Sequence, residues 1–253
     1  MHQKHHSNLD KDGIPRLSKS ALQTFRQCPE KFKYVYIDHL PDLGGAESML
    51  GKKIHEVFFE YHKTLNVEKV KSEKDLVVHA ELFKENHYAK HLGHFVDFTC
   101  DMYRNLKNKT LVRPILAEEK FIHPTMHLSG LVDAVFQDDD GNCLVMDYKS
   151  GKFDQRKIPE YRMELSVYAE FVKLRTSYTP THWGIFFSSV GVRWTEPVDP
   201  KYFDEVVVPL YNSTRASIKK KQYLPNIGPL CMYCPFKNRC SAWGGIKDPR
   251  LKE

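Results

Sequence analysis

The stretch from Leu128 to Lys149 constrains the fold of this chain more than any other. It contains two apolar runs rich in β-branched and aromatic residues, separated by the Asp- and Gly-rich segment 138–142. Turn residues between two such runs predict a pair of adjacent strands. One carboxylate interrupts each run, Asp133 in the first and Asp147 late in the second. The pattern therefore predicts a hairpin that carries acidic side chains on otherwise apolar strands.

The second strand also carries a cation next to its carboxylate. Because strand side chains alternate between faces, Asp147 and Lys149 project from one face and Tyr148 from the other. Carboxylate oxygens hold Mg²⁺ or Mn²⁺, the metal activates a water, and a lysine can steady that water or the developing charge. This combination suits phosphodiester hydrolysis. The alternative is that Asp133 and Asp147 are solvent-facing positions on ordinary strands, since short motifs match by chance.

The residues around these acids resemble a known family. Gly130-Leu131-Val132-Asp133 is followed by Asp147-Tyr148-Lys149-Ser150-Gly151. This pairing resembles the PD-(D/E)XK nuclease superfamily, in particular its RecB-type branch. The resemblance implies an α/β, restriction-endonuclease-like core, a mixed sheet flanked by helices. The order of elements expected over residues 48–189 (helix, three strands, helix, strand) agrees with such a layered architecture.

The resemblance also implies further residues of a metal site. Gly51 and His55 match a G-x-x-x-H helix that delivers a histidine to the metal, and the carbonyl of Tyr148 is a further expected ligand. Taken alone, an interior helix histidine such as His55 is more often a packed or solvated side chain than a metal ligand. The family places a glutamate on the strand that enters the hairpin. Glu119 is the expected residue, with Glu118 as the second choice because the register is uncertain by one position.

After the hairpin, the RecB-type pattern has Gln-x-x-x-Tyr on a helix that contacts nucleic acid. This chain has Glu164 and Tyr168 at those positions, so Tyr168 matches and Glu164 departs from the glutamine. Both are expected to contact DNA, with Glu164 adding negative charge near the metals.

A cluster of cysteines lies near the C-terminus. Cys231, Cys234 and Cys240 follow a C-x₂-C-x₅-C spacing, which is typical of thiolates that bind zinc or an iron–sulfur cluster. This part of the chain is similar to iron–sulfur nucleases of the RecB type, including those of CRISPR adaptation. The resemblance implies that Cys28 is the fourth ligand of a [4Fe-4S] cluster, with zinc as the alternative. Without the resemblance, Cys28 reads as a small buried hydrophobic residue.

Composition sets the remaining expectations. The chain has 253 residues, 41% of them hydrophobic and 28% charged, which is typical of a globular protein. No run approaches the roughly 20 apolar residues that span a bilayer, so we expect no membrane partner. We also expect a cytoplasmic location in a bacterial, archaeal or phage-infected host cell. Residues 1–16 are expected to be a disordered tail and 17–253 a single nuclease domain. Its core covers about 48–190, and residues 17–40 and 201–243 form a cysteine-bound accessory lobe from the two ends of the chain.

The function expected is a Mg²⁺- or Mn²⁺-dependent deoxyribonuclease, most simply a single-stranded DNA exonuclease of recombination, repair, CRISPR adaptation or phage DNA metabolism. The net charge of +6 permits a polyanionic partner without requiring one. Lys219-Lys220-Lys221, at the end of an expected helix, reads equally as a solvated helix end or as a DNA contact. One alternative is a DNA-binding or assembly subunit that keeps the fold without cleaving, supported by Glu164. Another is a zinc-stabilised interaction module in which the acids are incidental.

Overall fold

The computed structural model describes residues 9–41 and 46–243, and its internal contacts divide the chain into two compact units. We call residues 44–124 and 130–203 the sheet unit, and residues 1–43, 125–129 and 204–253 the terminal unit. The sheet unit encloses most of the core range expected from sequence, and the terminal unit combines the two ends of the chain. In the parts of the chain that the structure describes, no helix has both the length and the hydropathy to cross a membrane.

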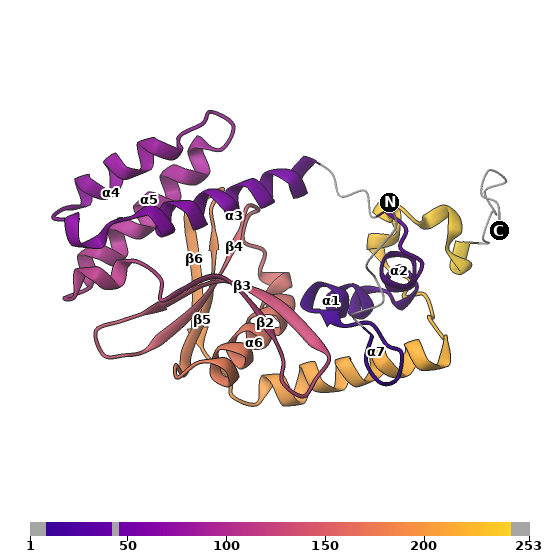
Figure 1. Cartoon of the computed structure of the whole chain (residues 1–253). Helices are drawn as coiled ribbons and strands as arrows, with labels where there is room; N and C mark the ends of the chain where they lie inside the picture. The colour runs from indigo at the N-terminus through magenta and orange to yellow at the C-terminus, as the bar shows by residue number, and fades with distance from the viewer. Residues whose placement is uncertain (1–8, 42–45, 244–253) are drawn as a thin grey trace. The chain divides into compact units, whose positions relative to one another are not determined.

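A mixed sheet forms the centre of the sheet unit (Figure 1). Its strand order is β3-β4-β5-β6, with β2 pairing on β3. The β3–β4 and β5–β6 pairs are antiparallel, whereas β4 and β5 are parallel. The helices and strands are α3 (Ala46–Thr64), α4 (Glu73–Ala80), α5 (Ala89–Asn105), β2 (Leu116–Ile122), β3 (Leu128–Gln137), β4 (Cys143–Lys149), α6 (Ile158–Arg175), β5 (Pro180–Phe187) and β6 (Val192–Pro197). The structure therefore confirms the expected α/β class, a mixed sheet flanked by helices.

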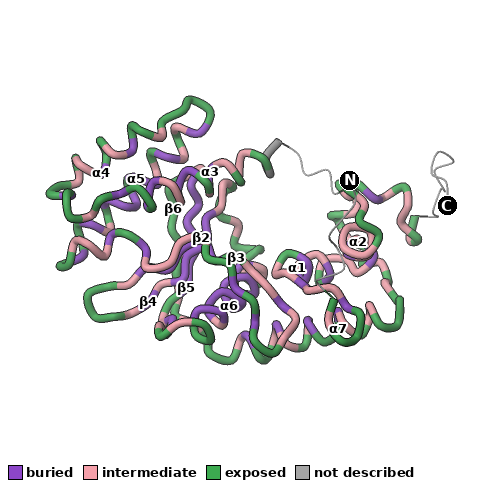
Figure 2. Tube along the Cα trace, viewed as in Figure 1, coloured by how far each residue is buried: buried purple, intermediate pink, exposed green. Residues whose placement is uncertain are grey.

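Helices cover both faces of this sheet, which buries its central strands (Figure 2). Tyr148 of β4 packs edge-on against Phe58 of α3, with ring centroids 5.2 Å apart, and Phe58 stacks on Phe95 of α5 at 3.9 Å. Helix α6 packs against β4 and β5. Because both faces are covered, β4 is apolar in nearly every position rather than alternating. A carboxylate within such a strand is therefore costly unless it has a partner.

The terminal unit is built from short elements. They are β1 (Leu17–Ser18), α1 (Lys19–Gln27), α2 (Pro29–Phe32) and α7 (Val208–Lys220). Strand β1 pairs in parallel with Leu128 and Ser129, and the Ser18 hydroxyl caps α1 by accepting from the amide of Ala21. Cys28 ends α1 and precedes Pro29, the first residue of α2, so the cysteine lies at a sharp break between two helices.

Part of the expected disordered tail is ordered. Residues 1–8 lie outside the described residues, but residues 9–16 form a turn in which the Asp10 carboxylate accepts from the amide of Ile14. Ile14 is buried, and Asp10 forms an ion pair with Arg215 of α7. The composition of residues 9–16 gives no sign of this order, because the partner that fixes the turn lies some 200 residues further along the chain.

Candidate active site

The β3–β4 hairpin brings its two acids into the interior. Ala134 pairs with Met146 across the two strands, so Asp133 and Asp147 lie near each other along the hairpin. Their exposed fractions are 4% and 1%, respectively. The Asp133 carboxylate accepts from the amide of Tyr148 at 2.8 Å. Two acids this deeply buried cost free energy unless cations or hydrogen-bond donors surround them.

One group of possible metal donors gathers around Asp133. His55 of α3, Glu118 of β2 and Asp133 of β3 each offer one atom, and these atoms lie within 4.8 Å of one another. The His55 Nδ1 atom is 3.6 Å from Glu118 Oε1 and 3.4 Å from Asp133 Oδ2. Carboxylate oxygens with one imidazole suit Mg²⁺ or, better, Mn²⁺. The structure thus contains a donor group that fits a divalent metal.

The other nitrogen of His55 fixes the orientation of the ring. Nε2 lies 2.7 Å from the carbonyl oxygen of Tyr148, and only a protonated Nε2 can donate to that carbonyl. Nδ1 faces the carboxylates of Glu118 and Asp133, so a protonated ring donates to them, whereas a neutral ring would offer the Nδ1 lone pair to a metal ion held between them. The Tyr148 carbonyl, which the sequence suggested as a direct ligand, contacts His55 in this structure.

The electrostatics of the group favour positive charge. Burial by itself disfavours a charged imidazole, but the contacts with Asp133 and Glu118 outweigh it and raise the pKa of His55 to about 10. The carboxylates therefore create a potential that attracts a cation, whether a proton or a metal ion.

Lys149 lies beside this group and is held by two acids. Its Nζ is 2.8 Å from Asp147 Oδ2 and donates to both oxygens of Glu164 at 2.9 Å. The Glu164 residue is only 4% exposed. The structure thus gives Glu164 a partner that the sequence did not suggest, because the expectation was a contact with DNA. A glutamate at this position, where the RecB-type pattern has a glutamine, adds one negative charge next to the lysine.

Tyr168 also lies in the interior. It is 1% exposed, and burial raises the pKa of its hydroxyl well above the ordinary value. A side chain so deeply enclosed lies away from any surface that a DNA strand could contact in this conformation. The structure therefore leaves no exposed surface of Tyr168 for the expected contact with DNA. Because Tyr168 lies one helical turn after Glu164 on α6, its ring can instead pack beneath the residues of the site.

On β2, the glutamate that lies near His55 and Asp133 is Glu118, the second choice from sequence, and Glu119 is exposed at the neighbouring position. Glu118 has a backbone φ of +50°, in the left-handed region that non-glycine residues avoid. At this point the alternation of β2 breaks, so that Glu119 and Lys120 are both exposed in succession while Glu118 is partly buried. The strained residue turns the Glu118 side chain toward His55 and leaves Glu119 in solvent. Strain of this kind is typical of functional sites.

A glycine of the sequence motif has a steric role. A Cβ atom on Gly130 would lie 2.8 Å from the ring of Phe171 on α6, closer than such contacts normally come. The glycine of Gly130-x-x-Asp133 therefore lets α6, which carries Glu164, approach the strand that carries Asp133.

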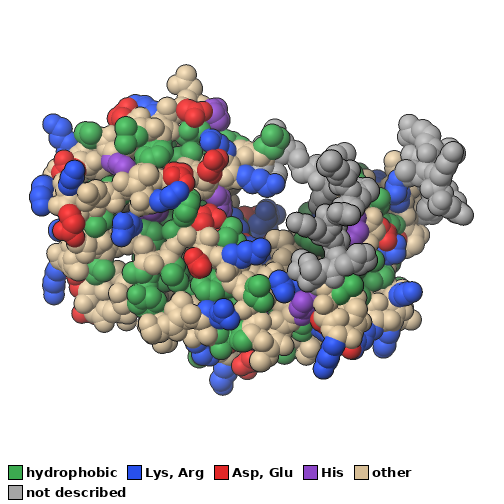
Figure 3. Space-filling model, in the orientation of Figure 1, with side chains coloured by type: hydrophobic (Ala, Val, Ile, Leu, Met, Phe, Trp, Pro, Cys, Tyr) green, Lys and Arg blue, Asp and Glu red, His purple; other side chains and the backbone are tan. Residues whose placement is uncertain are grey.

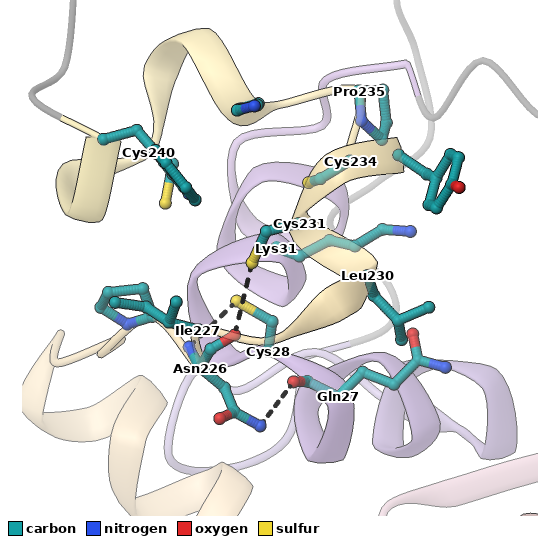
Figure 4. A pocket seen from close by; sticks show the side chains of 14 residues that line it. Gln27, Cys28, Lys31, Asn226, Ile227, Leu230, Cys231, Cys234, Pro235 and Cys240 are labelled. Carbon is teal, nitrogen blue, oxygen red and sulfur yellow. Dashed lines mark hydrogen bonds between the residues drawn. The ribbon is translucent and has the colours of Figure 1, made fainter.

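The second candidate site lies in the terminal unit, where all four expected cysteines line one cavity of about 230 Å³ (Figure 4). Cys28 lies at the α1–α2 break, and Cys231 and Cys234 lie in and next to the 3₁₀ turn Pro229–Tyr233. Backbone amides of Asn226 and Gly228 lie 3.5 Å from Cys28 Sγ and 3.4 Å from Cys231 Sγ. Amide donors near cysteine sulfurs are a means by which proteins stabilise thiolates and tune bound clusters.

A buried carboxylate holds the last cysteine of the cavity. Glu30 of α2 is 7% exposed and accepts from Tyr34 Oη at 2.9 Å, from Cys240 Sγ at 3.3 Å and from the amide and hydroxyl of Ser241 at 3.0 Å each. These contacts join the segment around Cys240 to the helix that follows Cys28. Glu30 carries no motif signal, and only its partners identify it.

With this geometry in view, comparison with known proteins identifies the class. Residues 16–241 match the PD-(D/E)XK nuclease superfamily, so the chain belongs to this superfamily of metal-dependent nucleases. One solved structure that resembles the chain is described as "Crystal structure of SSO0001"; it is 15% identical, with a TM-score of 0.36, and the match covers 78% of this chain and 97% of that one. No curated protein matches the sequence.

Proposed function

We propose that this protein is a Mg²⁺- or Mn²⁺-dependent deoxyribonuclease, most simply an exonuclease on single-stranded DNA. The observation that carries the proposal is the convergence of His55, Glu118 and Asp133 within 4.8 Å, next to a lysine held by Asp147. A superfamily match alone says that the fold is that of nucleases. The intact donor group and lysine support an enzyme that cleaves.

The residues have separable roles in this proposal. His55, Asp133 and Asp147 hold the metal, and Glu118 completes the acidic group. A bound divalent ion would supply an activated water and neutralise charge on the scissile phosphate. Lys149, fixed between Asp147 and Glu164, orients that water or stabilises the negative charge of the transition state.

Cleavage of end-labelled DNA with Mg²⁺, with Mn²⁺ and with EDTA tests the proposal. We expect metal-dependent cleavage, abolished by EDTA and reduced by at least about 10³-fold in Asp147→Asn, because removing one member of a unit disables it. Linear and circular single strands separate the two modes, since an exonuclease leaves the circle intact. Wild-type activity in Asp147→Asn would contradict the assignment of the site.

A second candidate function rests on the Lys149–Glu164 pair. A lysine bound to two buried acids is partly neutralised, as a subunit that binds DNA without cleaving could tolerate. Under this alternative, wild-type protein binds DNA but leaves it intact with either metal. Glu164→Gln, which restores the family's residue, would then gain cleavage.

We further propose that Cys28, Cys231, Cys234 and Cys240 hold a [4Fe-4S] cluster, with zinc as the alternative. In a tetrahedral zinc site, with Zn–S bonds of about 2.3 Å, the sulfurs lie about 4 Å apart. A cavity of about 230 Å³ lined by all four cysteines supports a cluster of several atoms rather than a single ion.

A further inference from the structure

A second cavity in the terminal unit has a basic lining. This groove of about 630 Å³ lies between the turn of residues 9–16, the segment after α2 and the end of α7. Its charged lining consists of Arg16, Lys33, Lys219 and Lys221, with Asp12 as the one acid. His39 and the rings of Tyr36 and Tyr223 also line it. No cysteine belongs to this lining, so the groove is separate from the cavity described above.

The acids near the groove neutralise only part of its charge. Asp12 pairs with Lys219 at 3.0 Å and with Arg215 at 2.8 Å, and Lys33 pairs with Asp38. Within residues 9–41 and 46–243, neither Arg16 nor Lys221 forms an ion pair. Two of the four cations are therefore available to an external anion.

Arg16 supplies an independent sign of a missing partner. Its Nε atom is buried and has no hydrogen-bond acceptor in the described part of the chain. A buried donor without an acceptor is unfavourable, and an anion held by the Arg16 guanidinium would supply an acceptor. The planar guanidinium suits a phosphate in particular.

We propose that this groove binds the phosphate backbone of a single-stranded nucleic acid. Cations in a groove that also contains aromatic rings are the combination that single strands use, since phosphates contact the cations and bases can stack on rings. On the face shown in Figure 3, lysine and arginine side chains are scattered among acidic ones. The inference rests on the proposed nuclease function and adds to it a strand-binding surface outside the acidic site.

Two neighbouring lysines provide a matched test. Lys221 lines the groove and Lys220, next to it at the end of α7, does not. Binding of a fluorescently labelled single-stranded 20-mer is followed by anisotropy in EDTA, so that no cleavage occurs, over a series of salt concentrations. The variants are Arg16→Gln, Lys221→Gln and the control Lys220→Gln, each checked for an unchanged melting temperature.

Arg16→Gln and Lys221→Gln should each weaken binding about fivefold and reduce the slope of log K against log salt by about 0.7, the value for one lost phosphate contact on a single strand. Lys220→Gln should leave the slope unchanged. Equal effects of Lys220→Gln and Lys221→Gln would overturn the groove proposal, because binding would then depend on the overall positive charge rather than on the position of the lysine. Tighter binding to duplex of the same length, or to anionic lipid vesicles, would overturn its assignment to a single strand.

The outcome is independent of the nuclease proposal. If the wild type cleaves DNA and the groove variants bind normally, the groove proposal fails alone. If the wild type never cleaves but the groove variants lose binding, the nuclease proposal fails and the groove stands.

Discussion

The candidate active site and the cysteine cavity both gather metal donors, but from different kinds of structure. His55, Glu118, Asp133 and Asp147 come from a long helix and paired strands, and their neighbours are packed rings and backbone hydrogen bonds. The cysteines lie on a helix break and short 3₁₀ turns around a cavity. The first site is shaped by the folding of its sheet, whereas we expect the second to depend for much of its stability on the cluster proposed for it.

Removing a cysteine should therefore affect folding, and this is the largest effect we expect. If the four cysteines hold the proposed cluster, Cys28→Ser should bleach the brown colour of anaerobically purified protein and lower the free energy of unfolding by about 4 kcal/mol, since the proposed cross-link closes a loop of roughly 200 residues. Iron analysis and a denaturant titration measure both changes.

Cys100→Ala is the matched control, because Cys100 is buried in the sheet unit, is not among the residues that line the cavity, and has a thiol whose pKa burial raises to about 11. It should keep colour and iron content. Retention of full colour in Cys28→Ser would show that Cys28 is no ligand. Colourless wild-type protein with one zinc per chain would show a zinc site in place of the cluster, without affecting the nuclease proposal.

The active site should respond in activity rather than in folding. Glu118→Gln should reduce the cleavage rate by about 100-fold, roughly 2.7 kcal/mol, because it removes a charged member of the metal group. Glu119→Gln, at the exposed neighbouring position, should change the rate less than twofold. Single-turnover kinetics at saturating metal compares the two variants. A larger loss in Glu119→Gln than in Glu118→Gln would assign the role to Glu119, the residue first expected from the sequence.

The third prediction concerns the loss of folding stability of the sheet unit at low pH. His62 of α3 is fully buried against Phe95 and Phe136, and neither of its nitrogens has a hydrogen-bond partner in the described part of the chain. Burial lowers the pKa of His62 to about 3. Below pH 6.5 the unfolded chain binds this proton while the folded chain does not, so stability falls as the pH drops from about 6.5 toward 3.

At pH 5 the loss should be about 2 kcal/mol relative to pH 7, and His62→Leu should remove this part of the pH dependence. Urea titrations at several pH values measure it. Because His62 lies in the sheet unit, the slope should be the same in Cys28→Ser. An unchanged slope in His62→Leu would show that other groups cause the acid sensitivity.

Much of the active site could be predicted from local patterns. The hairpin follows from two apolar runs and a turn, and the match of Gly130-x-x-Asp133 and Asp147-x-Lys149 to a family places the acids. His55 follows from helical spacing plus the same resemblance. The choice between Glu118 and Glu119 could not be made, because it depends on a positive φ that breaks the alternation of β2.

The sequence by itself determined the α/β class, the acidic hairpin with its lysine and the cysteine spacing near the C-terminus. These features depend on residues close together in the chain, whose geometry follows from strand and turn periodicity. The tertiary structure decided that Glu164 holds Lys149, that Glu30 holds Cys240 and that Arg215 orders the turn at Asp10. The last two contacts join segments more than 200 residues apart, and the first joins a strand to the helix that follows it. Nothing in a local pattern specifies which side chain of another element will fill a given space or satisfy a given buried charge.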